Sequence, residues 1–308
     1  MRFRVDAVIT ALALAAGLLT GSAAIAQEPA DSDAIARGKY VFDAAGCYGC
    51  HTDEKSKGAP LAGGRALKTP FGTFYGPNIT PDPEHGIGGW TLEDFTRALR
   101  QGIAPDGSAF YPVFPYTSFT GMTDADVANL WAYLRSVDPV AEPSKDHDIG
   151  FPFSMRWLNS VWQSLYFEAG RFDAYEPPPG VATDDVAAWR RGGYLVHALT
   201  HCGECHTPRG ILGAKDETLS LAGNADGPDG DPAPNITPDP ATGIGDWSVG
   251  DITTYLQIGM LPDGDFAGSA MAEVIKNSTG KMTDADRRAI AIYVHSLAPI
   301  EHRVARKK

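Results

Sequence analysis

The sequence has few cysteines, no excess of basic residues and, beyond its N-terminus, no long hydrophobic run. All four cysteines of the 308 residues lie in two short segments, so none is left over for a structural disulfide elsewhere. The 38 acidic residues outnumber the 26 basic ones, and the net charge of −12 disfavours a nucleic-acid-binding protein, which needs a basic surface. Beyond residue 26 no stretch approaches the length of a membrane span. A hydrophobic content of 43% and a charged content of 21% indicate a folded globular chain.

The N-terminal segment, residues 1–26, has the features of a secretory signal peptide. Arg2 and Arg4 precede an uncharged and mostly apolar run, and Ala24-Ile25-Ala26 fits the small-residue rule for cleavage. We therefore expect export to the periplasm. An uncleaved membrane anchor is the alternative, because residues 7–26 carry no charge.

The chain contains an internal repeat, in which several short words recur in the same order. Cys47-Tyr48-Gly49-Cys50-His51 recurs as Cys202-Gly203-Glu204-Cys205-His206, Pro77–Asp82 as Pro234–Asp239, and Met122–Asp126 as Met282–Asp286. Chance does not produce such an ordered set, so the chain is predicted to hold two copies of one domain. The expected division is a domain over residues 31–138, a linker over 139–183 and a second domain over 184–308.

Helical periodicity predicts an all-α fold with three helices in each copy. The expected ranges are Ala34–Ala45, Leu92–Gln101 and Asp124–Ser136, then Val186–Leu199, Val249–Ile258 and Asp284–Leu297. Apolar residues at helical spacing between residues 154 and 168 predict an amphipathic helix in the linker, with its apolar face packed across both domains. The 34 glycines and 23 prolines predict long loops, and such loops in a compact domain suggest that something other than side chains fills the core.

Each copy carries the pattern C-x-x-C-H, which is typical of covalent haem attachment. The two cysteines can form thioethers to one haem, and the histidine that follows can bind its iron. The residues concerned are Cys47, Cys50 and His51 in the first copy and Cys202, Cys205 and His206 in the second. A thioredoxin-like redox pair would need a strand–helix setting, a zinc site would need four ligands in one place, and a disulfide at this spacing would be strained. The sequence therefore predicts two covalently attached haem c groups.

With these motifs the sequence resembles the di- and multi-haem cytochrome c subunits of periplasmic and membrane-associated dehydrogenases of the alcohol-dehydrogenase type. The resemblance spans roughly residues 34–298. Besides the cysteine motifs it rests on Gly76–Asp82, Gly86–Trp90, Tyr111–Tyr116, Pro234–Asp239 and Ala270–Glu273. It implies two tandem class I cytochrome c domains joined by the linker.

The resemblance also implies roles for residues around each haem. The carbonyl groups of Pro77 and Pro234 are expected to accept a hydrogen bond from Nδ1 of the histidine ligand, which tunes the iron. The indole N–H groups of Trp90 and Trp247 are expected to reach a haem propionate, because a buried indole needs a hydrogen-bond acceptor. Simple core packing is the alternative for both tryptophans.

The resemblance further implies a close helix crossing in each copy. Gly38 and Gly193 are expected where the first helix crosses the last, near Tyr133 and Tyr293. The family needs a residue without a side chain at this point. We interpret both glycines as fold residues only.

The sixth iron ligand is expected to differ between the two haems. Met271 is expected in the loop where the resemblance places the methionine ligand, and methionine opposite histidine raises a haem potential. The corresponding position of the first copy is Phe114, which cannot bind iron. The first haem is therefore expected to have an open site or a substitute ligand, for which Met122 is the best candidate. Met122 also precedes Thr123, a predicted helix N-cap, so packing against the helix start is its alternative role.

These inferences lead to one main functional hypothesis. The chain is expected to be an exported dihaem cytochrome c that carries electrons from a periplasmic dehydrogenase to a cytochrome, an oxidase or a copper protein of the respiratory chain. It is expected to have no substrate chemistry of its own and no nucleic-acid partner. Peripheral membrane association is compatible with this electron-carrier role. The alternative is a haem enzyme, peroxidase-like or acting on a small inorganic ion, with an open iron site at the first haem.

Overall fold

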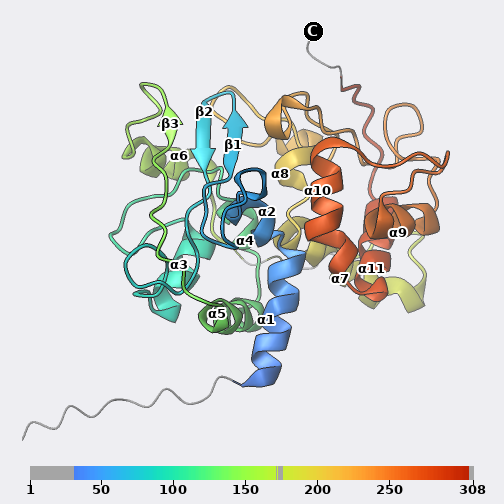
Figure 1. Cartoon of the computed structure of the whole chain (residues 1–308). Coiled ribbons are helices and arrows are strands. Elements are labelled where there is room, and N and C mark those ends of the chain that lie inside the picture. The colour runs from blue at the N-terminus through green and yellow to red at the C-terminus, as the bar shows by residue number, and fades with distance from the viewer. Residues whose placement is uncertain (1–30, 171, 173–175, 305–308) are drawn as a thin grey trace, which may run out of the picture.

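The computed structural model describes residues 31–170, 172 and 176–304. The predicted signal segment, residues 1–26, lies outside the described residues. The helices form two groups that lie side by side, and the two cysteine segments lie where these groups face each other (Figure 1). Within the described ranges, no helix combines the length and the apolar character needed to cross a membrane.

The first group consists of α1, α2, α3, α4 and α5, and α1 packs across α5. Their bounds are Ser32–Ala44, Cys47–His51, Leu92–Gln101, Tyr116–Phe119 and Asp124–Ser136. The second group consists of α7, α8, α9, α10 and α11, and α7 packs across α11. Their bounds are Val186–Tyr194, Gly203–His206, Val249–Ile258, Ser269–Asn277 and Asp284–His295. The three helices predicted for each copy are therefore present, within a few residues of the expected ends.

Helices α3 and α9 begin and end in the same way, which explains why their bounds could be predicted. Thr91 caps α3 and Ser248 caps α9, each in a capping box with an aspartate three residues later, Asp94 or Asp251. Both helices end at a glycine in the left-handed conformation, which a residue without a side chain adopts at little cost.

The close helix crossing is observed in both groups, but the second predicted glycine is one residue away from it. A Cβ atom on Gly38 would lie 1.9 Å from the carbonyl oxygen of Asn129, as expected of a residue at the crossing. In the second group it is Gly192 whose added Cβ would lie 2.0 Å from the carbonyl oxygen of Ala289. Gly193 instead faces aromatic rings, so its assignment to the crossing is wrong.

The reason for this error is a π-helical turn. Helix α7 continues as a π-helix over Leu195–Leu199, in which the amide of Thr200 donates to the carbonyl of Leu195 at 2.7 Å. The second copy has one residue more than the first between its crossing glycine and its first motif cysteine. A π-turn accommodates one extra residue without ending the helix. The cysteine segment therefore keeps its place despite the insertion.

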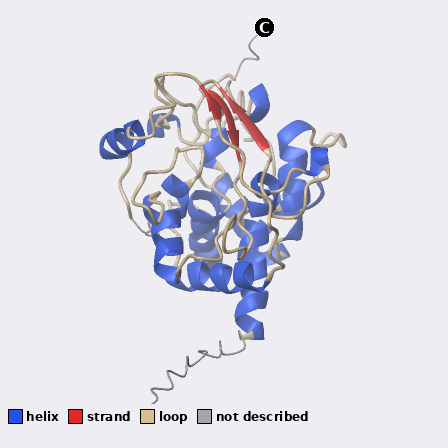
Figure 2. Ribbon diagram, turned by 60° about the vertical axis from the view of Figure 1, so that its left-hand side comes forward, coloured by secondary structure: helices blue, strands red, loops and turns tan. Residues whose placement is uncertain are grey.

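A small antiparallel sheet departs from the expected all-α fold. It has the order β1-β2-β3, with bounds Ala66–Thr69, Gly72–Tyr75 and Asp148–Ile149. Figure 2 shows its strands on one edge of the helical body. A two-residue turn joins β1 to β2, and Gly72 beside it has a φ of 127°, which glycine tolerates. With two to four residues each, the strands are too short for an alternating pattern to reveal them.

The linker helix is present as α6, Leu158–Tyr166, but it does not pack as predicted. The indole N–H of Trp162 donates to the carbonyl of Leu212 at 2.8 Å, and the side-chain NH₂ of Gln163 donates to the carbonyl of Gly102 at 3.2 Å. The helix thus touches both groups through polar contacts. Three of the predicted apolar residues are exposed instead, with fractions of 62%, 45% and 66% for Trp157, Val161 and Leu165, while Leu158 and Trp162 are partly buried.

Candidate haem sites

The histidine of each cysteine motif is held by the predicted proline. Nδ1 of His51 lies 2.8 Å from the carbonyl oxygen of Pro77, and Nδ1 of His206 lies 2.7 Å from that of Pro234. A carbonyl can only accept, so Nδ1 carries the proton in both rings. Nε2 is then left as the nitrogen that can bind a metal. Burial lowers the pKa of both histidines, which favours the neutral, ligating form.

The loop that follows each motif is braced by the same backbone contacts. The carbonyl of His51 accepts from the amide of Gly63 at 2.8 Å, and the carbonyl of His206 accepts from that of Gly223 at 2.7 Å. The hydroxyl of the threonine directly after each motif accepts from a leucine amide at 3.0 Å in both halves. These threonines, Thr52 and Thr207, were missed by the sequence analysis. Their recurrence directly after C-x-x-C-H is the signal that could have identified them.

The asparagine after each proline explains why Pro-Asn-Ile-Thr recurs. The side-chain oxygen of Asn78 accepts from the amide of Thr80 at 2.9 Å, and its NH₂ group donates to the carbonyl of Val140 at 2.8 Å. Asn235 accepts from the amide of Thr237 at 2.9 Å and donates to the carbonyl of Ile300 at 2.8 Å. Each asparagine therefore ties the proline turn to the segment that follows the last helix of its half.

The donor set of each motif fits a covalently attached haem. None of the four cysteines is engaged in a disulfide, so both cysteines of each motif are available for thioethers. Helices precede both motifs in place of the strand of a thioredoxin-like site. Across the described ranges, no three His, Cys, Asp or Glu side chains are grouped as a metal site would require. This arrangement supports neither the redox-pair reading nor the zinc reading.

The candidate sixth ligands lie in different surroundings. Met271 was expected in a loop but lies on α10, where it is partly buried against the core. Phe114 packs against Phe119, with ring centroids 5.9 Å apart. Met122 is fully buried in the core cluster that also contains Val127, which is the packing that a helix-start role predicts. That Met271 or Met122 binds iron stays a prediction.

Trp90 and Trp247 occupy equivalent positions beside α3 and α9. Both are half-buried and pack against the core, and the ring of Trp247 lies 5.4 Å from that of Tyr255. Neither indole N–H donates to a protein acceptor among the described residues. An unused donor next to the core fits a propionate partner, and the packing fits the structural alternative. The propionate contact stays a prediction.

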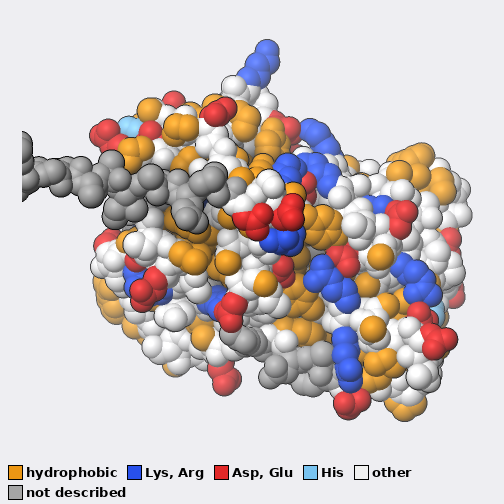
Figure 3. Space-filling view, turned by 90° about the horizontal axis from the view of Figure 1, so that it is seen from below, with side chains coloured by type: hydrophobic (Ala, Val, Ile, Leu, Met, Phe, Trp, Pro, Cys, Tyr) orange, Lys and Arg blue, Asp and Glu red, His pale blue; other side chains and the backbone are white. Residues whose placement is uncertain are grey.

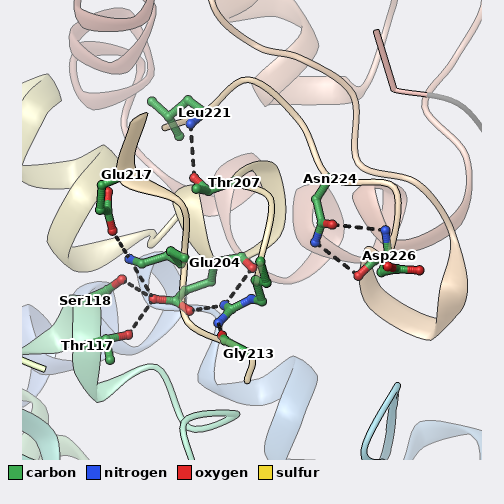
Figure 4. A network of polar contacts seen from close by, with 11 residues as sticks. Thr117, Ser118, Glu204, Thr207, Gly213, Glu217, Leu221, Asn224 and Asp226 are labelled. Atoms are coloured by element: carbon green, nitrogen blue, oxygen red, sulfur yellow. Dashed lines mark hydrogen bonds and ion pairs between the residues drawn. The ribbon is translucent and has the colours of Figure 1, made fainter. Parts of the chain in front are cut away.

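One buried charged residue in the second motif was missed by the sequence analysis. Glu204 accepts hydrogen bonds from Arg209 at 2.5 Å and Lys215 at 3.3 Å, and its side chain is only 10% exposed (Figure 4). Burial alone would raise the pKa of Glu204, but these two cations and two hydroxyl donors together hold it well below its ordinary value. The first motif has Gly49 at this place, and a comparison of the two copies would have revealed the difference.

Comparisons with known proteins agree with this geometry. Residues 35–138 match the cytochrome c family. The chain is similar to a dihaem c-type cytochrome of Cereibacter sphaeroides, with 45% identity over 269 residues and 86% of each chain covered. It is also similar to the cytochrome c subunit of a quinone alcohol dehydrogenase of Gluconacetobacter polyoxogenes and to the fructose dehydrogenase cytochrome subunit of Gluconobacter japonicus, with 43% and 42% identity.

The last two alignments cover 95% and 91% of this chain but only 62% and 57% of those relatives. The dihaem relative, by contrast, is matched over most of its length. The resemblance inferred from the sequence motifs is thereby confirmed. The chain belongs to the c-type cytochrome family.

Proposed function

We propose that this chain is an exported electron-transfer protein that holds two covalent haem c groups, one in each half. The observation that carries the proposal is the matched histidine geometry. In both halves the imidazole that follows two free cysteines has its Nδ1 fixed on a proline carbonyl, at 2.8 and 2.7 Å. A relative that is similar over 86% of its length is named as a dihaem cytochrome, which supports a haem in each half.

The residues of each half have separate tasks toward the haem. The bound haem supplies the one-electron chemistry of its iron. Cys47 and Cys50 hold the first haem by thioethers, and His51 binds its iron through Nε2. Cys202, Cys205 and His206 do the same in the second half. The prolines fix the tautomer and orientation of each imidazole, burial favours its neutral form, and Met271 would complete the coordination of the second iron.

The proposed partners are a periplasmic dehydrogenase as donor and a downstream cytochrome, oxidase or copper protein as acceptor. Support comes from the similar proteins that are named as cytochrome subunits of alcohol and fructose dehydrogenases. Residues 1–26 support export to the periplasm, and peripheral membrane association is compatible with this location. On the face seen in Figure 3, acidic and basic side chains lie next to one another, so the net charge of −12 does not define a docking patch there.

Phe114 favours a second candidate function. A phenylalanine at the place of the methionine ligand leaves the sixth position of the first iron without that ligand. Such a site suits a peroxidase-like enzyme or an oxidoreductase of a small inorganic ion. High-spin iron with peroxide turnover would support the enzyme, whereas low-spin iron at both haems supports a pure carrier.

Haem content tests the main proposal. The intact protein is expected to keep two haems per chain through acid–acetone extraction, because thioethers are covalent. The double variant Cys47→Ala, Cys50→Ala should keep one, and Cys202→Ala, Cys205→Ala is the matched control with the other haem retained. N-terminal sequencing of the periplasmic fraction checks export and cleavage after residue 26. Haem that washes out of the intact protein would contradict the proposal.

A further inference from the structure

The cysteine segment of the second half reaches into the first half through Glu204. Its carboxylate accepts hydrogen bonds from the hydroxyls of Thr117 at 2.8 Å and Ser118 at 2.6 Å, both on α4 (Figure 4). The same carboxylate is paired with Arg209 and Lys215 on its own half. Glu204 is thus the central acceptor of a buried network that spans the two halves.

The elements joined by this network lie beside the second cysteine motif and the residue expected opposite His51. Helix α4 begins two residues after Phe114, which aligns with the proposed ligand Met271, and Phe119 of α4 packs on Phe114. The ring of Phe119 also lies 5.3 Å from that of His201, the residue before Cys202. The distal segment of the first site and the attachment motif of the second site are therefore packed as one unit.

The opposite junction is built from different chemistry. The first motif faces α10 of the second half, but Gly49 stands where the second motif has Glu204. The contacts there include ion pairs at the surface, such as Lys276 with Glu54 at 2.9 Å, whose side chains are 63% and 45% exposed, and a buried hydrogen bond from the Ser278 hydroxyl to the carbonyl of Ala44 at 2.8 Å. Exposed ion pairs contribute little, whereas a buried charge that is fully paired fixes its partners in place.

We propose that Glu204 is a positioning residue for the distal segment of the first haem site, acting from within the attachment motif of the second. The proposal rests on the proposed function, because it requires a haem in each half. Loss of the network frees α4 to shift, and with it the side chains opposite His51. A change beside the second haem therefore alters the spectrum and midpoint potential of the first.

The deciding variant is Thr117→Val with Ser118→Ala in the full, haem-loaded chain. It removes both hydroxyl donors but leaves Glu204 paired with Arg209 and Lys215, so the second motif is undisturbed. We expect a shift in the electron paramagnetic resonance signal and in the midpoint potential of the first haem. The methionine–iron band and the potential of the second haem should not change.

Two further variants complete the experiment. Glu204→Gln should shift the first haem in the same direction, and Glu54→Gln, the exposed carboxylate of the opposite junction, should shift neither haem. A first haem that is unchanged in Thr117→Val, Ser118→Ala, even with a lower denaturation midpoint, would overturn the positioning role. So would a shift confined to the second haem. Fewer than two haems in the parent protein would instead overturn the proposed function, so the two failures are distinguishable.

Discussion

The proximal sides of the two candidate sites are nearly alike, whereas the residues expected on their distal sides differ. The His51–Pro77 and His206–Pro234 contacts differ by only 0.1 Å, and the same threonine and glycine contacts brace both loops. At the positions where the resemblance places the sixth ligand, one half has Phe114 and the other has Met271, which lies on a helix. Both halves keep the contacts that orient the imidazole and differ in the residue expected to face it. The two irons are therefore expected to differ in potential because of their distal residues.

Substitutions at Met271 and Phe114 test whether these residues cause the difference between the two haems. Met271→Ala should abolish the methionine–iron charge-transfer band near the red edge of the visible spectrum, because the second haem is its only expected source. Phe114→Met should create a second such band and raise the potential of the first haem, since methionine ligation raises haem potentials. Absorption spectra and potentiometric titration measure both effects.

Met122→Ala and Met282→Ala are the matched controls for these exchanges. Both methionines are buried directly before a helix start, so their loss should lower stability and leave the band of the second haem in place. If Met271→Ala left two bands while each control removed one, the buried methionines would be the ligands. The distal assignment would then be wrong.

The helix crossings allow a test of how closely the two halves match. Gly38→Ala and Gly192→Ala should each lower the free energy of unfolding by about 3 kcal/mol, because the added Cβ would overlap a backbone carbonyl that cannot retreat. Gly193→Ala should cost less, because its added Cβ would meet ring atoms at 2.9 Å rather than a carbonyl at 2.0 Å. Denaturant titration of the haem-loaded variants checks the order. Equal costs at Gly192 and Gly193 would contradict the register of the crossing.

The sequence predicted best the features whose motifs occur in both copies of the repeat. The recurring words identified the motif cysteines and histidines, the two prolines and the bounds of α3 and α9. The failures lie where the copies diverge or where the pattern is too short. The extra residue before Cys202 moved the crossing from Gly193 to Gly192, and strands of two to four residues gave no periodic signal. Glu204 was missed because its partners on α4 are distant in sequence and meet it only in the folded chain.

A smaller effect is expected at two tyrosines that link the halves in a matched way. The hydroxyl of Tyr40 on α1 donates to Asp286 at the start of α11 at 2.6 Å, and the hydroxyl of Tyr194 on α7 donates to Asp126 at the start of α5. Tyr40→Phe and Tyr194→Phe should each cost about 1.5 kcal/mol, the lower end for a hydrogen bond to a charged acceptor. Thermal unfolding of both variants measures this. If only one of the two variants lost stability, the two hydrogen bonds would not contribute equally to the stability of the junction.

The smallest effect is expected at an exposed side chain of the linker helix, which forms hydrogen bonds to both halves through Trp162 and Gln163. Leu165→Gln should change the free energy of unfolding by less than about 0.5 kcal/mol, because this side chain is 66% exposed. Trp162→Phe should cost about 1 kcal/mol, because it removes the hydrogen bond to the carbonyl of Leu212 and leaves that acceptor without its donor. The denaturation midpoints of the two variants decide the matter. If Leu165→Gln lowered the free energy of unfolding more than Trp162→Phe does, the apolar face of α6 would have to be buried. An apolar side chain contributes that much stability only when it is removed from water.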